Sequence, residues 1–245
     1  MKKTATKNTK STETSAIVIK PVDLRTASIR IVGTTPLIVH AFSEKAKREM
    51  LDAQRSTTKV TKKHVNRIPM ADMIGATYWL SGAPDIDLEN LPREDVAVAD
   101  KMCEDAWESA LENGARFGFP ATGIKQAAIM AASRYKIDVQ TTALRGIFFI
   151  AGEGPNQLVE IKGCKPVVRE DVCKVGGISK TADLRYRPEF DNWYMDLKIQ
   201  YNANGPISLE QIINLINLGG FCCGIGEWRP ERDGNYGMFQ VQTEE

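Results

Sequence analysis

Apolar and polar residues alternate along two stretches of the chain, and each stretch predicts a long β-strand. The first runs from Leu24 to Val39 and is interrupted at Gly33-Thr-Thr-Pro36. The second covers Asn192–Tyr201. Because successive side chains of a strand point to opposite faces, this alternation gives each strand one apolar face to bury. In the second strand that face comprises Trp193, Met195, Leu197 and Ile199.

Apolar residues recur at helical spacing in other parts of the chain. Ser208 and Gln211 form a capping-box sequence, in which each side chain can bond the other residue's backbone N–H. Ser43 and Thr122 are the predicted N-caps of two further helices. Between residues 96 and 111, small apolar residues occupy one face and acidic residues the other. The predicted helices span about 43–54, 96–111, 122–134 and 208–219.

Shorter apolar segments complete the predicted elements. They indicate strands at about 143–151, 158–161, 166–172 and 236–242, while residues 69–80 fit a helix or a strand equally well. Irregular spacing of strands and helices indicates an α+β protein with mainly antiparallel pairing. The element order fits a ferredoxin-like (RRM-like) antiparallel sheet core with a helical insertion at about 57–135 and a C-terminal glycine-rich loop. We predict one domain over 21–245.

Charged residues are segregated along the chain, although the formal net charge is only +1. Residues 1–67 carry 15 Lys/Arg and 5 Asp/Glu, whereas residues 68–113 carry 2 and 11. Separate basic and acidic surfaces suit a polyanionic ligand, and they equally suit head-to-tail association of identical chains. Residues 1–20 are rich in Lys, Thr and Ser, which predicts a disordered basic arm.

Several classes of protein are disfavoured. The chain has no apolar run of the roughly 18 residues that would span a bilayer, and its N-terminus lacks the apolar stretch of a signal peptide. We therefore expect a cytoplasmic protein without a membrane partner. The five cysteines have no metal-ligand spacing, which favours reduced thiols. Motifs for a P-loop, a zinc protease or a nucleophile elbow are absent, so we expect neither a metal nor a cofactor.

The C-terminal region carries the first candidate binding site. Six glycines within residues 219–237 surround Trp228, Arg229, Arg232 and Tyr236. Glycine lets a backbone approach a ligand closely, guanidinium groups bind phosphate, and aromatic rings stack on bases. We predict a nucleic-acid-binding loop. The alternative is a tight turn with a cation–π contact between Arg229 and Trp228.

The helix predicted at 122–134 carries the second candidate site, made of Arg116, Lys125 and Arg134. A lysine is unfavourable beside the positive N-terminal end of a helix, and Gly123 costs about 1 kcal/mol relative to alanine. These two penalties favour a bound anion such as a backbone phosphate. The alternative is a solvated lysine on an otherwise apolar helix.

A third set of cations completes the predicted binding residues. Arg185 and Arg187 share one face if their segment is extended, which suits a track for a nucleic-acid backbone. Ordinary pairing with neighbouring acidic residues is an equally good interpretation. Lys62, Lys63 and His64, in a basic loop at 57–67, would add further contacts to phosphates.

Two motifs resemble those of the RAMP superfamily, the ferredoxin-like RNA-binding proteins of CRISPR effector complexes, particularly their guide-RNA backbone subunits. They are the glycine-rich segment Gly224–Val241 and the segment Phe119–Arg134. The whole chain is also similar to uncharacterised proteins of tailed bacteriophages. The chain departs from the family pattern where Trp228–Arg232 interrupts the glycines and where Gln126 replaces the usual glycine after the lysine. The resemblance implies a protomer that lines up along a nucleic-acid strand, in the host bacterium's cytoplasm if the chain is phage-encoded.

We therefore predict a non-enzymatic protein that binds single-stranded nucleic acid, RNA or DNA, and oligomerises along it. One alternative is a phage structural or assembly protein that polymerises without nucleic acid. Another is a metal-independent ribonuclease that uses His64 or His40 in acid–base transfer, although the sequence identifies no partner for either histidine.

Overall fold

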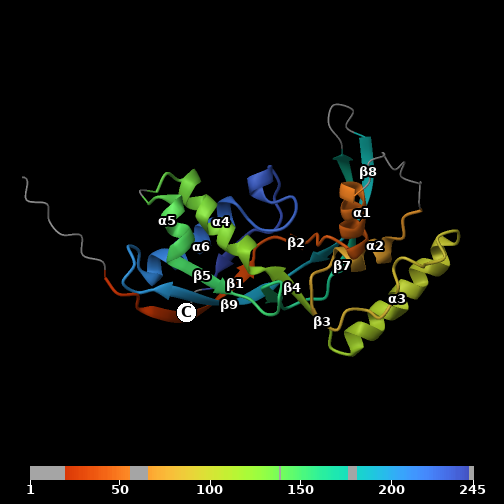
Figure 1. Ribbon diagram of the computed structural model, residues 1–245, viewed down its shortest axis with the longest axis horizontal. Helices are drawn as coiled ribbons and strands as arrows, with labels where there is room; N and C mark the ends of the chain where they lie inside the picture. The colour runs from red at the N-terminus through yellow and green to blue at the C-terminus, as the bar shows by residue number, and fades with distance from the viewer. Residues whose placement is uncertain (1–19, 56–65, 138, 176–180, 243–245) are drawn as a thin grey trace, which may run out of the picture.

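The central sheet has four antiparallel strands in the order β10-β1-β9-β5 (Figure 1). A computed structural model of the chain describes residues 20–55, 66–137, 139–175 and 181–242, so Lys62, Lys63, His64 and nearly all of the basic arm lie outside it. Three helices, α4, α5 and α6, lie together on one face of the sheet. These seven elements are β1 (Leu24–Gly33), α4 (Ala121–Arg134), α5 (Thr141–Ile147), β5 (Phe148–Ala151), β9 (Tyr194–Asn202), α6 (Leu209–Cys222) and β10 (Phe239–Val241).

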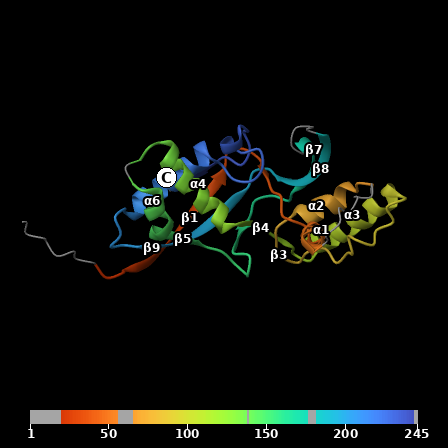
Figure 2. The same ribbon diagram turned by 45° about the horizontal axis from the view of Figure 1, so that its top comes forward.

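Most of the remaining elements gather at the other end of an elongated molecule (Figure 2). They include two small antiparallel sheets, ordered β2-β8-β7 and β3-β4-β6. The described part of the chain is thus an α+β protein with three antiparallel sheets, which confirms the predicted class. These elements are β2 (Leu37–Ile38), α1 (Glu44–Arg55), α2 (Pro69–Ala76), β3 (Trp79–Ser81), α3 (Val96–Glu112), β4 (Arg116–Pro120), β6 (Leu158–Ile161), β7 (Val167–Val175) and β8 (Thr181–Phe190). The 3-10 helix η1 (Pro230–Arg232) instead contacts α6.

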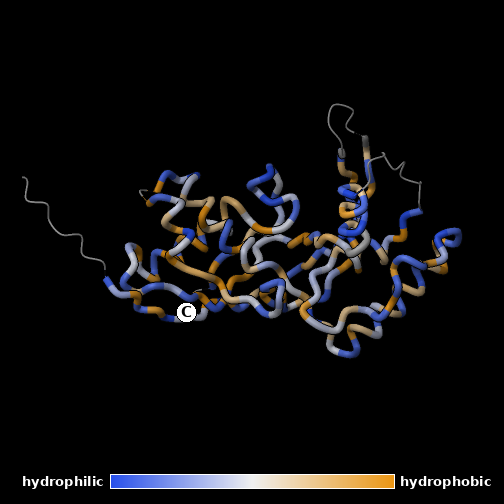
Figure 3. The backbone as a smooth tube through the Cα atoms, in the orientation of Figure 1, coloured by the Kyte–Doolittle hydropathy of each residue, from blue (hydrophilic) through white to orange (hydrophobic). Residues whose placement is uncertain are grey.

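The core forms where α4 and α6 cover the sheet, and hydrophobic stretches of the backbone lie in that layer in Figure 3. The predicted apolar face of β9, from Trp193 to Ile199, has no solvent exposure. Close packing of the two helices depends on small residues: a Cβ on Gly219 would lie 2.7 Å from the backbone nitrogen of Ala128. A larger side chain at either position would force the helices apart. At the end of β1, a Cβ on Gly33 would overlap the ring of Trp193.

Local signals predicted several element boundaries correctly. The capping box of Ser208 and Gln211 is present at the start of α6, and Ser43 Oγ accepts a hydrogen bond from the Ala46 amide at the start of α1. The segment 69–80, which fitted a helix or a strand equally well, contains both: helix α2 is followed by strand β3. Among the helices of the described residues, none is long and apolar enough to cross a bilayer.

Other boundaries differ from the prediction. Residues 141–147 form helix α5 instead of the start of a strand, because this turn buries Leu144 and Ile147 beneath α4. Helix α4 begins at Ala121, directly after Pro120, and Thr122 is not its cap. Helix α6 continues three residues beyond Gly219, whose missing side chain serves the contact with α4. The predicted insertion at 57–135 includes α4, which packs on α6 and β5.

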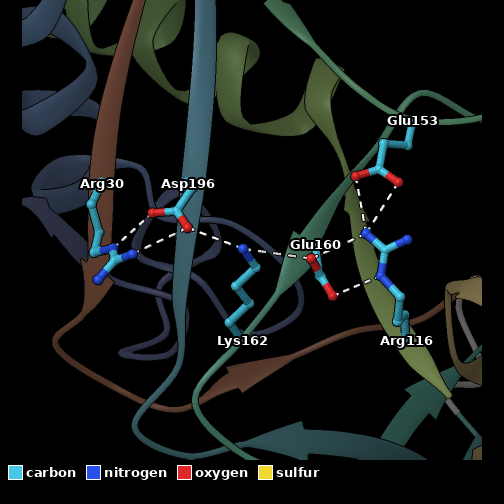
Figure 4. A network of polar contacts seen from close by, with 6 residues as sticks. All are labelled: Arg30, Arg116, Glu153, Glu160, Lys162 and Asp196. Carbon is cyan, nitrogen blue, oxygen red and sulfur yellow. Dashed lines mark hydrogen bonds and ion pairs between the residues drawn. The ribbon is translucent and has the colours of Figure 1, made fainter. Parts of the chain in front are cut away.

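A chain of ion pairs crosses from the central sheet to the β3-β4-β6 sheet (Figure 4). Arg30 on β1 binds Asp196 on β9 at 2.7 Å, and Asp196 also contacts Lys162 at 3.1 Å. On the second sheet, Arg116 binds Glu160 at 2.8 Å, and Lys162 lies 3.6 Å from the same carboxylate. Lys162 therefore bridges carboxylates of both sheets.

This network predicts a contribution to stability that depends on pH. Hydrogen bonds from Arg30 and Arg116 hold the pKa values of Asp196 and Glu160, respectively, below their usual values. A lowered folded-state pKa stabilises the fold above the unfolded-state pKa of about 4, and the contribution is lost as pH falls through the folded-state value. We expect Glu160→Gln to lower Tm by roughly 1–4 °C at pH 7 because exposed pairs are weak. The difference from wild type should shrink from pH 5 to pH 2, as measured by thermal circular dichroism. A pH-independent difference would contradict this account, and Glu108→Gln on exposed α3 is the control.

Candidate functional site

A cleft of about 1250 Å³ lies where α1, α2 and the loop after β3 face the β7–β8 hairpin. Its described lining holds more basic side chains than acidic ones. An exposed aromatic ring, Phe42, stands at the cleft. The basic lining residues are Lys47, Arg48, Arg67, Arg93, Arg185 and Arg187, and the acidic ones are Asp72, Asp87, Glu89 and Asp183.

Ion pairs within the cleft are mostly exposed to solvent. Arg48 contacts Glu89 at 2.6 Å, with 65% of the arginine side chain exposed. Arg67 contacts Asp72 at 3.0 Å and Asp183 at 3.1 Å, and about half of its side chain is exposed. Exposed pairs of this kind contribute about 0–1 kcal/mol. Breaking one of these pairs therefore costs the fold little free energy.

Arg187 is the exception, because its side chain is only 3% exposed. Its Nη1 donates to Asp171 Oδ2 at 3.2 Å, and its Nη2 lies 4.0 Å from Glu227 Oε2. Its Nε is buried without a hydrogen-bond partner. A buried cation requires compensating charge, and here it comes from strand β7 and from the loop after α6. Arg187 therefore joins the hairpin to that loop.

A second pocket, of about 210 Å³, lies between α4 and the loop after α6. His40 and Tyr78 line both this pocket and the large cleft, so the two spaces adjoin. His40 Nδ1 lies 3.7 Å from Glu227 Oε1, which provides the partner that the sequence did not identify. His40 and Arg187 hold the pKa of Glu227 below its usual value, against the opposing effect of partial burial. Glu227 is therefore an ionised carboxylate at the wall of the pocket.

The glycines of the loop serve contacts within the protein. Gly226 has φ +77°, and a Cβ there would overlap the carbonyl oxygen of Ile38. Gly237 has φ +64°, and a Cβ there would overlap the carbonyl oxygen of Ile225. The sequence suggested that glycines leave room for a ligand backbone. In the structure they leave room for the protein's own backbone, and this packing places Glu227 beside His40.

Arg116 and Lys125 have partners inside the protein, which differs from the expected orientation toward phosphate. Arg116 donates to Glu160 at 2.8 Å and to Glu153 at 3.0 Å, and these bonds raise its pKa (Figure 4). Lys125 Nζ donates to the Arg145 carbonyl oxygen at 2.6 Å and lies 4.0 Å from the centre of the Phe149 ring. Burial lowers the pKa of Lys125.

Among the predicted binding residues of the glycine-rich loop, some side chains contact other groups of the protein and others are exposed to solvent. Arg229 is held by Glu231 at 2.9 Å and by the Gly226 carbonyl oxygen at 2.9 Å. The ring of Tyr236 lies under the guanidinium of Arg169 at 4.5 Å.

The other three predicted residues of this region lie nearer the solvent. Trp228 is 40% exposed and Arg232 is exposed, while Arg134 Nη2 donates a long 3.5 Å hydrogen bond to the Glu231 carbonyl oxygen. Of the twelve predicted residues, the large cleft brings together Arg185 and Arg187, and the small pocket includes Arg229.

On the helix-free face of the central sheet, Tyr194 is covered by an arginine, whereas Phe149 is half-exposed. RRM proteins stack bases on aromatic rings of that face. Here Arg30 lies over the ring of Tyr194 at 4.3 Å and binds Asp196. The Tyr194 ring and the charge of Asp196 are therefore both already in contact with Arg30.

Sequence analysis missed the residues of α1 that line the large cleft, including Lys47 and Arg48, whereas Arg67 ends the basic loop predicted at 57–67. Their weak signal was the basic composition of residues 1–67. The described residues contain no group of three or more His, Cys, Asp or Glu side chains placed to hold a metal ion. No protein-family model matches the chain, and no curated protein matches it significantly. The lining of the two pockets therefore carries the functional inference.

The burial of Arg187 predicts a large effect of removing its carboxylate partner. We expect Asp171→Ala to lower the free energy of unfolding by about 3–5 kcal/mol, because it leaves a buried guanidinium without its nearest charge. The exposed Asp196→Ala should cost less than about 1 kcal/mol. Urea unfolding followed by circular dichroism measures both. Equal effects of the two variants would show that Arg187 is not electrostatically dependent on Asp171.

Proposed function

We propose that this protein binds single-stranded nucleic acid along the large cleft, with the strand passing the small pocket. The observation that carries the proposal is the cleft itself, with six basic side chains against four acidic ones among its described residues. Binding of single strands combines basic grooves that follow the backbone with rings that accept stacked bases. Phe42 offers such a ring, and the exposed arginines offer cations that can exchange partners.

We further propose a ferredoxin-like core of the RAMP type. Support comes from the order along the chain, β1-α4-β5-β9-α6-β10, together with the sheet order β10-β1-β9-β5. This is the strand–helix–strand–strand–helix–strand pattern of that fold. In this scheme residues 34–120 and 152–193 are insertions, and they supply most of the cleft lining.

Self-association along the strand is part of the same proposal. The segregation of charge along the sequence supports it, because residues 1–67 are strongly basic whereas residues 68–113, which include helix α3, are strongly acidic. A head-to-tail contact between unlike faces produces a ring or an open array instead of a two-fold dimer, and the proposal takes the open array. A nucleic-acid strand would then set the array's length.

The cleft assignment predicts which arginines matter. We expect the double variant Arg48→Ala/Arg67→Ala to bind a labelled 20-nucleotide single strand at least tenfold more weakly, because two phosphate contacts are lost. The variant should also show a shallower dependence of log Kd on log salt by about two contacts. Fluorescence anisotropy with RNA and DNA strands measures both quantities.

Two exposed arginines outside the cleft provide the matched control. Arg25→Ala/Arg30→Ala removes the same charge from pairs with Asp23 and Asp196. This control should bind like wild type. Equal weakening by both double variants would mean that binding is non-specific, and absence of binding by wild type would reject the function. Shortening of RNA in EDTA that disappears in His40→Ala would assign cleavage instead.

A further inference from the structure

The small pocket has the size and walls of a site for one planar group. Its volume of about 210 Å³ is below the range of about 300–1,000 Å³ typical of pockets for drug-sized ligands. Tyr78 and Phe119 line it and meet edge to face, with ring centres 6.3 Å apart. His40 adds a third ring. Such walls suit an aromatic ring system better than a sugar or a phosphate.

The charges of the pocket disfavour a phosphate. Glu227 and Glu231 both line it, and the only arginine among its described lining residues, Arg229, is already bound to Glu231 at 2.9 Å. The first turns of α4 share this pocket through Gly123. Two carboxylates of the protein itself therefore share the pocket with the positive end of that helix.

Glu227 retains capacity to accept hydrogen bonds. Its two oxygens lie 3.7 Å from His40 Nδ1 and 4.0 Å from Arg187 Nη2, and both distances exceed hydrogen-bond length. The side chain is 41% exposed, so a ligand can reach it. An ionised carboxylate in this position can accept both hydrogen bonds from a ligand that presents two adjacent N–H groups.

Among the four common bases, guanine has that arrangement on its Watson–Crick edge, with N1–H beside the 2-amino group. Adenine and cytosine place a ring acceptor beside their amino group, and uracil or thymine places its N–H between two carbonyl groups. Each of these would set an acceptor against a carboxylate oxygen, which is unfavourable. The amide of Gln126, also at the pocket, can donate to guanine O6.

We propose that the pocket between α4 and the glycine-rich loop takes one base of the bound strand and selects guanine through the Glu227 carboxylate. This inference rests on the proposed single-strand binding. It adds sequence preference to a cleft whose arginines contact only the backbone. Base-edge contacts specify sequence, whereas phosphate contacts give affinity.

The test compares strands that differ at one base. Labelled 12-nucleotide oligo(U) and oligo(dT) strands carry guanine, adenine, cytosine or inosine at one central position. We expect wild type to bind the guanine strand roughly tenfold more tightly than the adenine strand, as for a bidentate base contact. Inosine lacks the 2-amino group and should give an intermediate affinity.

Variants then locate the preference. Glu227→Gln should reduce the guanine-to-adenine ratio of affinities to less than roughly threefold, because the second acceptor is lost. Using the ratio cancels any general change in affinity caused by the altered charge. Glu108→Gln on the exposed face of α3 is the control and should keep the wild-type ratio.

The outcomes separate the two proposals. Equal binding of guanine, adenine and inosine strands by wild type would overturn the pocket assignment while leaving single-strand binding in place. A guanine preference that persists in Glu227→Gln would also overturn it. Failure of wild type to bind any of these strands would reject the proposed function itself. The inosine comparison requires no variant, so it decides the matter even if Glu227→Gln does not fold.

Discussion

The buried guanidinium of Arg187 is the interaction on which the arrangement of both pockets depends. Arg187 lies on β8, donates a hydrogen bond to the carboxylate of Asp171 on β7, and faces the carboxylate of Glu227 in the loop after α6. A cation with 3% exposure is stable only where surrounding charges replace its water, and Asp171 and Glu227 provide that replacement. Glu227 also faces His40, which lines both the large cleft and the small pocket. The positive charge of Arg187 therefore holds the Glu227 carboxylate at the boundary between the cleft and the pocket.

Small residues hold the other wall of the pocket. Gly219 allows α6 to approach α4 at Ala128, and the loop that follows α6 is pinned by close backbone contacts at Gly226. Larger side chains at these positions would move Glu227 relative to Gly123 of α4, since the pocket lies between the two segments. Packing of the core is therefore coupled directly to the shape of the site.

Sequence patterns predicted those parts of the molecule that depend on local interactions. Alternation identified β1 and β9, and the capping box located the start of α6, because both signals act over a few residues. Helix α5 was mistaken for a strand because its seven residues form a helix only where Leu144 can be buried beneath α4. The partners of Arg116 and Lys125 could not be predicted, since Glu160 lies 44 residues away and the Arg145 carbonyl oxygen is 20 residues away. The prediction that Arg185 and Arg187 share a strand face agrees with their common position in the lining of the large cleft. Their different burial, partial for Arg185 and nearly complete for Arg187, depends on tertiary contacts and could not be predicted from the sequence.

The distribution of charge divides the proposed binding surface into two kinds of contact. In the large cleft, arginines such as Arg48 pair with exposed carboxylates, and these weak pairs yield to a strand carrying many phosphates. In the small pocket the carboxylates exceed the available cations, so a phosphate is repelled while a neutral base with N–H donors is attracted. On the helix-free sheet face, Arg30 covers Tyr194 and pairs with Asp196, so this ring and these charges already have partners within the protein. In the proposed complex, the backbone and the base of a nucleotide would therefore meet opposite electrostatic environments in the two adjoining spaces, and this contrast would favour entry of the base, not the phosphate, into the small pocket.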